Sequence, residues 1–318
     1  MTQFISIARL AFVLLVSITL TAKGHAAHST GKFESSILDL KLVENRWDPK
    51  ADQVHKGTII LVHGVKDYGD RYKGFADYAN RLGYTVKILD LPGHGDSPRE
   101  ASSKPGPDGL ILNMDAVAET ITSQVAATRR ENPRRPVFVI GYSMGGAIVS
   151  RAAELHQKEF EDGVVLISPA LEPFNLQKIL LPLLSGIGSV WPNAHIWGGL
   201  ECSKFSNSPS VVKNLETSPR VFKGDYPIRT GTEIAHETYK INGNIEDFVS
   251  PVLIIHSAAD QVTNPHGSQR TFDSISSPDK TLKIIPKELA VKHDLLHEPN
   301  GEGEEIQKLI MAWIKKRT

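Results

Sequence analysis

The sequence predicts an α/β fold in which a mostly parallel sheet is covered by helices on both faces and a helical cap is inserted between two sheet strands. Short apolar runs alternate along the chain with segments whose apolar residues recur at helical spacing, which favours repeated β-α units. Between two of the predicted strands lie roughly eighty residues, and a connection of that length needs structure of its own. With 40% hydrophobic and 23% charged residues in 318, the composition is that of a packed globular protein.

The elements of the first third follow from local patterns. Apolar and polar residues alternate over Ser36–Val43, as in an edge strand, whereas Gly57–His63 and Thr85–Leu89 are apolar runs typical of buried strands. Helical spacing extends over Tyr72–Leu82 and ends at a glycine. The stretch Asp90–Gly109 is rich in Gly, Pro, Ser and charged residues, so we expect a loop there.

The remaining elements show the same two patterns, apolar runs for strands and amphipathic spacing for helices. Strands are expected at Pro136–Ile140, Gly163–Ile167, Val252–Ile255 and Thr281–Ile285, and helices at Met114–Arg130, Gly145–Leu155, Ser268–Ile275 and Glu304–Ile314.

The chain divides into a leader and a domain with an insertion. We expect a signal peptide at 1–26, a sheet domain formed by 27–170 and 251–318, and a helical cap at 171–250. The cap segment Leu176–Gly188 is rich in Leu and Ile, and Trp191 and Trp197 follow it. These apolar residues either hold the cap on the sheet domain or line a lipophilic pocket.

The leader has the layout of a secretory signal. An apolar stretch, Leu10–Ala22, is followed by small residues at Gly24 and Ala26, which suit cleavage after Ala26. Cleavage predicts export to a periplasm or out of the cell. The alternative is an uncleaved anchor that tethers the protein to a membrane, although Arg9 shortens the uncharged stretch.

Charge and cysteine content argue against nucleic-acid binding, internal disulfides and Cys-rich metal sites. Lys and Arg number 36, as do Asp and Glu, so the formal net charge is zero and the chain has no overall attraction for nucleic acid. The single cysteine, Cys202, excludes an internal disulfide and a Cys-rich metal site. We expect this lone thiol to lie in the cap and assign it no role.

The strongest motif is Gly141-Tyr142-Ser143-Met144-Gly145, which lies directly between a predicted strand and a predicted helix. A serine on such a sharp turn is held in a strained geometry, and Gly141 and Gly145 remove side chains that would clash there. The helix N-terminus directs free N–H groups at developing negative charge. The motif therefore predicts that Ser143 is a nucleophile.

A serine hydroxyl needs a base, and the base needs an orienting acid. Asp260 and His293 each follow a predicted strand, in the chain order Ser, Asp, His that this architecture requires. His297 competes for the role of base, and Glu172 is the alternative acid. His256, at the end of an apolar strand, is interpreted as a packed core residue.

Two backbone N–H groups should stabilise the oxyanion of the tetrahedral intermediate. Met144 N–H, next to the nucleophile, is one candidate. Val65 N–H, in the loop after the first buried strand, is the other, because Gly64 allows a tight turn there. We expect His63 in the same loop to be a hydrogen-bonded structural residue.

Taken together, these segments resemble the α/β-hydrolases, and within them the branch of monoacylglycerol lipases and lysophospholipases. The resemblance rests on LVHGVKDYGDRY, GHGDS, GYSMGG, HSAADQV, TLKII and HDLLHE, and it covers about residues 35 to 316. It implies the α/β-hydrolase fold, with Ser143 as nucleophile, Asp260 as acid, His293 as base and the amides of Val65 and Met144 as oxyanion donors. It favours His293 over His297 and implies no metal or organic cofactor. The match is loose in the cap, which sets substrate size.

The expected function is cleavage of carboxylic esters of lipophilic substrates, of monoacylglycerol or lysophospholipid type, through an acyl-enzyme. The expected partner is a small lipophilic ester, with peripheral membrane contact through the cap as a further possibility. One alternative is a serine aminopeptidase or amidase on the same fold, for which Glu201, Glu216 and Asp225 could bind a substrate amine. A binding protein without catalysis fits poorly, because all three triad positions are filled.

Overall fold

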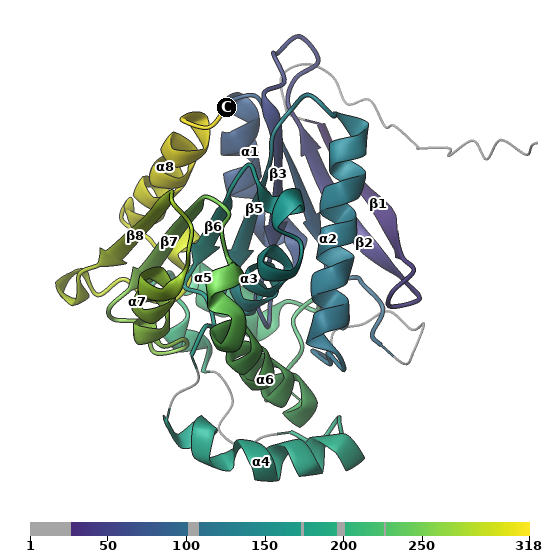
Figure 1. The fold of residues 1–318 in the computed structure, drawn as a ribbon, viewed down its shortest axis with the longest axis vertical. Coiled ribbons are helices and arrows are strands. Elements are labelled where there is room, and N and C mark those ends of the chain that lie inside the picture. Colours follow the sequence, from purple (N-terminus) through teal and green to yellow (C-terminus); the bar gives the residue numbers. More distant parts are fainter. Residues whose placement is uncertain (1–26, 101–107, 173–174, 196–200, 226) are drawn as a thin grey trace, which may run out of the picture.

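An eight-stranded sheet in the order β1-β2-β4-β3-β5-β6-β7-β8 forms the centre of the computed structural model (Figure 1). The structure describes residues 27–100, 108–172, 175–195, 201–225 and 227–318, with the backbone alone for 175–179. The strands are β1 Ala27–Ser35, β2 Leu40–Asp48, β3 Gly57–Val62, β4 Tyr84–Leu89, β5 Val137–Tyr142, β6 Val164–Ile167, β7 Val252–Ser257 and β8 Lys280–Ile285.

From β4 to β8 along the sheet, neighbouring strands are parallel, whereas β1 and β2 form an antiparallel hairpin that pairs with β4. The carboxyl ends of the parallel strands therefore meet at one edge, where open α/β sheets bind ligands. The loops after β3, β5, β7 and β8, which carry the predicted site residues, all leave the sheet at this edge.

Helices cover both faces of the sheet (Figure 1). The α-helices are α1 Lys73–Arg81, α2 Met114–Glu131, α3 Met144–Leu155, α4 Asn175–Val190, α5 Pro209–Thr217, α6 Ile228–Asn244, α7 Pro265–Ser274 and α8 Glu302–Lys315. Short 3-10 helices lie at Gly69–Tyr72, Gln157–Phe160, Cys202–Lys204, Ile245–Asp247, Lys287–Leu289 and Leu295–His297.

Strand β3 shows why the core has two halves. Ile59 and Leu61 pack with residues of α1 and α8, whereas Ile60 and Val62 pack with residues of α2 and α3. Successive side chains of a strand point to opposite faces, so a strand buried on both faces is a continuous apolar run. This is why β3 could be predicted from its sequence alone.

The connection from β6 to β7 contains α4, α5 and α6. Helix α6 packs against α3, and α4 packs against α6 on the side away from the sheet (Figure 1). Among the described residues, three α-helices thus lie in the segment in which the sequence predicts a cap. Trp197 and residues 1–26 of the predicted leader lie outside the described residues. No helix in the described ranges is long and apolar enough to cross a membrane.

The edge strand expected at Ser36–Val43 was placed incorrectly. Residues 36–39 form the turn between β1 and β2, and β2 begins at Leu40. Asp39 turns the chain with a φ of 53°, a left-handed conformation that Asp tolerates better than most residues. Because this turn holds two apolar residues and no Gly or Pro, the alternating pattern continued across it. The strand β1 that precedes the turn is almost wholly exposed and was not predicted.

Candidate active site

Ser143 lies at the turn from β5 into α3, as the motif predicted. Its backbone has φ 55° and ψ −120°, a conformation that costs on the order of 1–3 kcal/mol in a non-glycine residue. A Cβ on Gly145 would lie 2.1 Å from the Val62 carbonyl oxygen, and one on Gly141 would lie 2.6 Å from the Gly145 carbonyl oxygen. The turn therefore requires glycine at both positions and places Ser143 at the end of the sheet.

The three residues predicted to act together meet at this edge. His293 Nε2 lies 2.9 Å from Ser143 Oγ, and His293 Nδ1 lies 2.7 Å from Asp260 Oδ2. Asp260 comes from the loop after β7 and His293 from the loop after β8. The His293 side chain is fully buried and only 3% of Ser143 is exposed. Such a shielded geometry strengthens the hydrogen bonds between them.

The Asp260 carboxylate is held from both sides. Its Oδ1 accepts hydrogen bonds from the amides of Val262, at 2.7 Å, and Thr263, at 3.0 Å. Burial alone would raise the pKa of Asp260, but the neighbouring His293 and a hydrogen bond from His256 outweigh it and hold that pKa well below its usual range. Asp260 is therefore a carboxylate at neutral pH, and His293 Nδ1–H donates to it.

The loop after β3 lies directly beside the nucleophile. A Cβ on Gly64 would lie 2.8 Å from Ser143 Cβ. The backbone of Gly64 therefore lies next to the nucleophile, and Val65 is the next residue in the chain. His63 holds this loop: its Nδ1–H donates to the Gly64 carbonyl at 2.8 Å and its Nε2 accepts from the Leu91 amide at 3.0 Å. This is the structural role expected for His63.

Val65 and Met144, whose amides are the predicted oxyanion donors, are both buried residues, and Met144 directly follows Ser143 in the chain. In the described part of the chain, no acceptor outside the regular helices and strands takes a hydrogen bond from either amide. A buried N–H without a partner is costly, and the role of these two amides as oxyanion donors stays a prediction.

The alternative residues have other partners. His297 Nδ1 lies 2.7 Å from Asp294 Oδ1, and its Nε2–H donates to the Arg71 carbonyl at 3.0 Å. The Glu172 carboxylate lies 3.6 Å from Arg270 Nη1. His256 is fully buried, as expected of a core residue, but its Nε2 lies 3.2 Å from Asp260 Oδ2. Its interpretation as a packing residue was therefore incomplete.

The loop that carries His293 is anchored on several sides. The His293 carbonyl accepts from Ser168 Oγ at 2.9 Å, and the Asp294 amide donates to the Phe205 carbonyl at 2.7 Å. The Phe205 ring also meets the His293 ring edge-on, with 5.5 Å between centroids. Phe205 belongs to the segment between β6 and β7, so that segment contacts the predicted base directly.

Arg71 was not singled out in the sequence but is central to this anchoring. Its guanidinium bridges Asp67, at 2.8 Å, and Asp294, at 2.5 Å. Burial would raise the pKa of Asp294, but His297 and Arg71 outweigh it and hold the pKa below its usual range. The only hint in the sequence is that charged residues in DYGDRY follow a buried strand.

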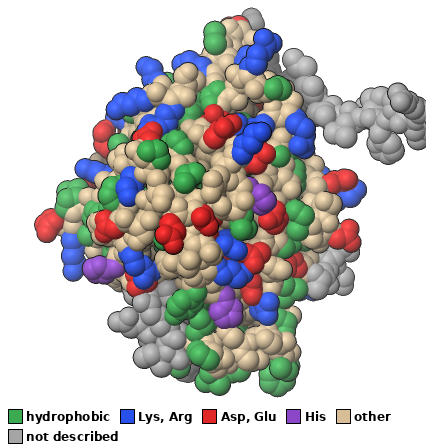
Figure 2. All heavy atoms as spheres, viewed as in Figure 1, with side chains coloured by type: hydrophobic (Ala, Val, Ile, Leu, Met, Phe, Trp, Pro, Cys, Tyr) green, Lys and Arg blue, Asp and Glu red, His purple; other side chains and the backbone are tan. Residues whose placement is uncertain are grey.

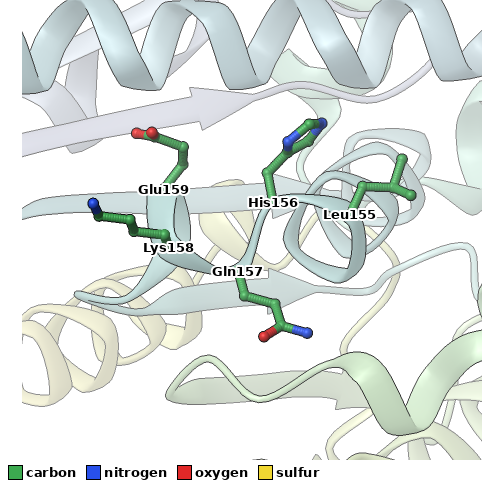
Figure 3. A pocket seen from close by; sticks show the side chains of 5 residues that line it. All are labelled: Leu155, His156, Gln157, Lys158 and Glu159. Carbon is green, nitrogen blue, oxygen red and sulfur yellow. The ribbon is translucent and has the colours of Figure 1, made fainter.

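Within the described ranges, no three His, Cys, Asp or Glu side chains are grouped so as to hold a metal ion. A surface hollow lined by residues Leu155 to Glu159 lies where α3 ends (Figure 3). Because α3 has 12 residues, its two ends are about 18 Å apart, and the hollow is remote from Ser143.

None of the three acidic residues considered for an amine subsite is fully buried. Glu201 and Glu216 are exposed, and Glu201 lies 3.5 Å from Lys204. Asp225 is half-buried. Cys202 is a half-buried free thiol, and burial raises its pKa.

Comparisons with known proteins agree with the geometry. A family model described as serine aminopeptidase, S33, matches residues 53–300. The chain is 25% identical over 280 residues to a monoacylglycerol lipase of Mycolicibacterium smegmatis, covering 86% of this chain and 93% of that protein. It is 26% identical over 275 residues to a caffeoylshikimate esterase of Arabidopsis thaliana, covering 82% and 78%. The crystal structure of a Paleococcus ferrophilus monoacylglycerol lipase superposes with a TM-score of 0.73 at 26% identity, covering 87% and 99%.

Proposed function

This chain belongs to the serine aminopeptidase S33 family of α/β-hydrolases, and we propose that it cleaves carboxylic esters of lipophilic substrates, of monoacylglycerol or lysophospholipid type. The observation that carries the proposal is the 2.9 Å contact between Ser143 Oγ and His293 Nε2. The similarity to a monoacylglycerol lipase over most of both chains supports an ester as the substrate.

The proposed reaction uses the tautomer that Asp260 imposes. With the Nδ1 proton of His293 held by Asp260, the Nε2 lone pair faces Ser143. As Ser143 Oγ attacks the carbonyl carbon, His293 Nε2 takes its proton. His293 then gives that proton to the departing alcohol, which leaves an acyl group on Ser143. Water repeats the sequence on the acyl-enzyme and releases the acid.

We assign the stabilisation of the negatively charged oxygen of the tetrahedral intermediate to the amides of Val65 and Met144. Both lie beside Ser143 in a buried site, where hydrogen bonds to charge are stronger than in water. Met144 is also the first residue of α3, so the positive end of that helix faces the same oxygen.

The test is a hydrolysis series on esters from acetate to palmitate, run with monoacylglycerol and with Ser143→Ala alongside. We expect the Ser143→Ala enzyme to lose turnover by about 10⁶-fold and to lose labelling by a fluorophosphonate probe. A preference for long acyl chains supports the lipophilic substrate. Acetate preference would limit the function to small esters, and near-normal activity of Ser143→Ala would remove the proposal.

Amide hydrolysis is the second candidate, because the family description names an aminopeptidase. An aminopeptidase needs a carboxylate placed to bind the substrate amine. Glu201 and Glu216 are exposed to solvent, which supports the ester over the amide. Turnover of aminoacyl amides above that of acyl esters would reverse this order.

We further propose that α4 contacts a lipid bilayer surface. Leu183, Val190 and Trp191 are exposed by 63%, 77% and 72%, and Leu180 and Ile187 by 38% and 37%. Their spacing places them along one side of α4 and its end. Residues 180–190 carry no charge, and green hydrophobic spheres gather over α4 at the foot of Figure 2. A lipophilic substrate would be reached from this side.

Export is the proposed localisation. The apolar stretch Leu10–Ala22 and the small residues Gly24 and Ala26 that follow it support cleavage after Ala26. Mass spectrometry of the protein from its native host should give a chain that begins at Ala27. A full-length chain in the membrane fraction would instead support the tethered alternative.

A further inference from the structure

The Asp260 carboxylate contacts two imidazoles, those of His293 and His256. Its Oδ2 lies 2.7 Å from His293 Nδ1 and 3.2 Å from His256 Nε2. The side chains of all three residues are fully buried. One carboxylate oxygen therefore binds the base of the proposed reaction and a second histidine that the reaction does not use.

The protonation of His256 follows from its partners. Asp260 is a carboxylate and can only accept, so the proton of His256 is on Nε2, which lies 3.2 Å from Asp260 Oδ2 and 3.3 Å from Thr263 Oγ1. The other ring nitrogen, Nδ1, lies 2.7 Å from Ser268 Oγ, and this hydroxyl donates to it. The result is a chain of hydrogen bonds, from Ser268 through His256 to Asp260 and from Ser143 through His293 to the same oxygen. A serine and a histidine thus stand on each side of one carboxylate.

His256 occupies a position at which an apolar residue would be expected. On β7, Val252 and Ile254 point to the core face shared with α2 and α3, and the strand period places His256 on that face too. A buried imidazole costs free energy unless both nitrogens have partners. Here both do, and one of the partners is the acid of the proposed triad.

The torsion that sets the plane of an Asp carboxylate is broad, so its orientation depends on hydrogen bonds. The amides of Val262 and Thr263 hold Oδ1. On the other oxygen, Thr263 Oγ1 lies 3.0 Å away, but the Ser168 carbonyl, also at 3.0 Å, competes for the hydroxyl proton. His256 Nε2–H is therefore a second imidazole donor within reach of Oδ2, at 3.2 Å, and Thr263 Oγ1 lies 3.3 Å from the same nitrogen.

We infer that His256 is a positioning residue for catalysis, which holds Asp260 Oδ2 in line with His293 Nδ1 through a tautomer set by Ser268. This inference rests on the proposed function. His256 lies on β7 and Ser268 on α7. Both elements therefore help to align the base His293, which belongs to neither of them.

Two amide variants that differ by one methylene separate this role from packing. His256→Gln places an amide donor near the position of Nε2. The shorter side chain of His256→Asn reaches only the position of Nδ1 and loses the contact with Asp260. We expect His256→Asn to lower kcat by about tenfold or more with KM unchanged, and His256→Gln to stay within about threefold of the wild type, on the scale of supporting hydrogen-bond partners. Thermal unfolding confirms that each variant is folded.

The proton on His293 Nδ1 supplies a readout that a packing role would not move. Its far-downfield ¹H NMR resonance should shift or broaden in His256→Asn and persist in His256→Gln. A folded His256→Asn with wild-type kcat and an unchanged resonance would overturn the inference, as would a folded His256→Gln as slow as His256→Asn.

A third variant keeps the test decisive if both His256 variants fail to fold. Ser268→Ala removes only the distant hydroxyl, and it should lower kcat by about two- to fivefold and shift the same resonance. No change in either quantity would overturn the inference. Failure of the proposed function has a different signature, because the wild-type protein itself would then lack ester hydrolysis.

Discussion

Arg71 Nη2 lies 2.5 Å from Asp294 Oδ2, and Asp294 directly follows the histidine that contacts Ser143. The same guanidinium reaches Asp67, in the loop that carries Val65. One buried arginine thus ties the loop of the predicted oxyanion donor to the loop of the predicted base. The two loops belong to opposite ends of the chain, and this ion pair is a direct link between them.

Removal of this arginine should therefore destabilise the protein strongly. Arg71→Met leaves Asp67 and Asp294 buried without their cation, and we expect a loss of about 3–5 kcal/mol in the free energy of unfolding. Urea unfolding measures it. Arg220→Met is the matched control, because Arg220 pairs with Asp70 at a half-exposed site and should cost less than about 1 kcal/mol. Equal losses in the two variants would contradict this account of the buried pair.

The turn at Ser143 should tolerate no side chain at Gly145. In Gly145→Ala the new Cβ would meet the Val62 carbonyl oxygen at 2.1 Å, so the backbone must move and activity should be lost with a drop in melting temperature. Gly243→Ala provides the comparison, because no atom lies within 4 Å of a Cβ there and α6 should gain about 0.5–1 kcal/mol. An active, normally stable Gly145→Ala enzyme would show that the turn is not needed in this form.

Glu154 should make the protein less stable at alkaline pH. Burial raises the pKa of Glu154 to about 8, against the opposing effect of Arg151. The unfolded chain ionises this group near its ordinary value, so its contribution to stability is full below about pH 4.5 and is lost as pH rises to about 8. Glu154→Gln should therefore raise the free energy of unfolding at pH 9 relative to the wild type, and less so at pH 5.

The control for this pH effect is Glu161→Gln, at a side chain that is 60% exposed. Its difference from the wild type should be nearly constant over the same pH range. If Glu154→Gln follows the same flat course, the carboxyl group is ionised in the folded protein at neutral pH and the stated cause is wrong.

The exposed side of α4 should be needed for lipid contact and not for chemistry. Leu183→Ser combined with Trp191→Ser removes two of the three apolar side chains most exposed on this side and should weaken co-sedimentation with phosphatidylcholine vesicles by about tenfold or more. Turnover of a water-soluble ester should stay unchanged. Vesicle binding equal to that of the wild type would exclude this face as the contact.

Much of the fold could be predicted because buried parallel strands are continuous apolar runs, as over Gly57–Val62. Helix α7 shows what local signals add: it begins at Pro265 with a side-chain cap from Asn264, three residues before the predicted start, and both signals stand in the sequence. The exposed strand β1 carried no such pattern, since its side chains face water.

The proposed site divides in the same way. Ser143 could be found from a local motif, and Asp260 and His293 from their places after strands. The contact between Arg71 and Asp294 joins residues 223 positions apart, and no local pattern reports it. The role of His256 was hidden for another reason: an imidazole at the end of an apolar strand has the same sequence context whether it fills space or holds a carboxylate.

The long insertion leaves the sheet after β6 and returns at β7, and these two strands are hydrogen-bonded neighbours with Ile167 opposite Ile255. This pairing does not depend on the insertion, so exchanging α4 for a segment of another length would leave the spacing between Asp260 and Ser143 unaltered. Phe205 lies after α4 and would stay against His293. Substrate selectivity in this scaffold can therefore be changed at α4, by selection or by an engineer, while the bond-breaking residues stay as they are.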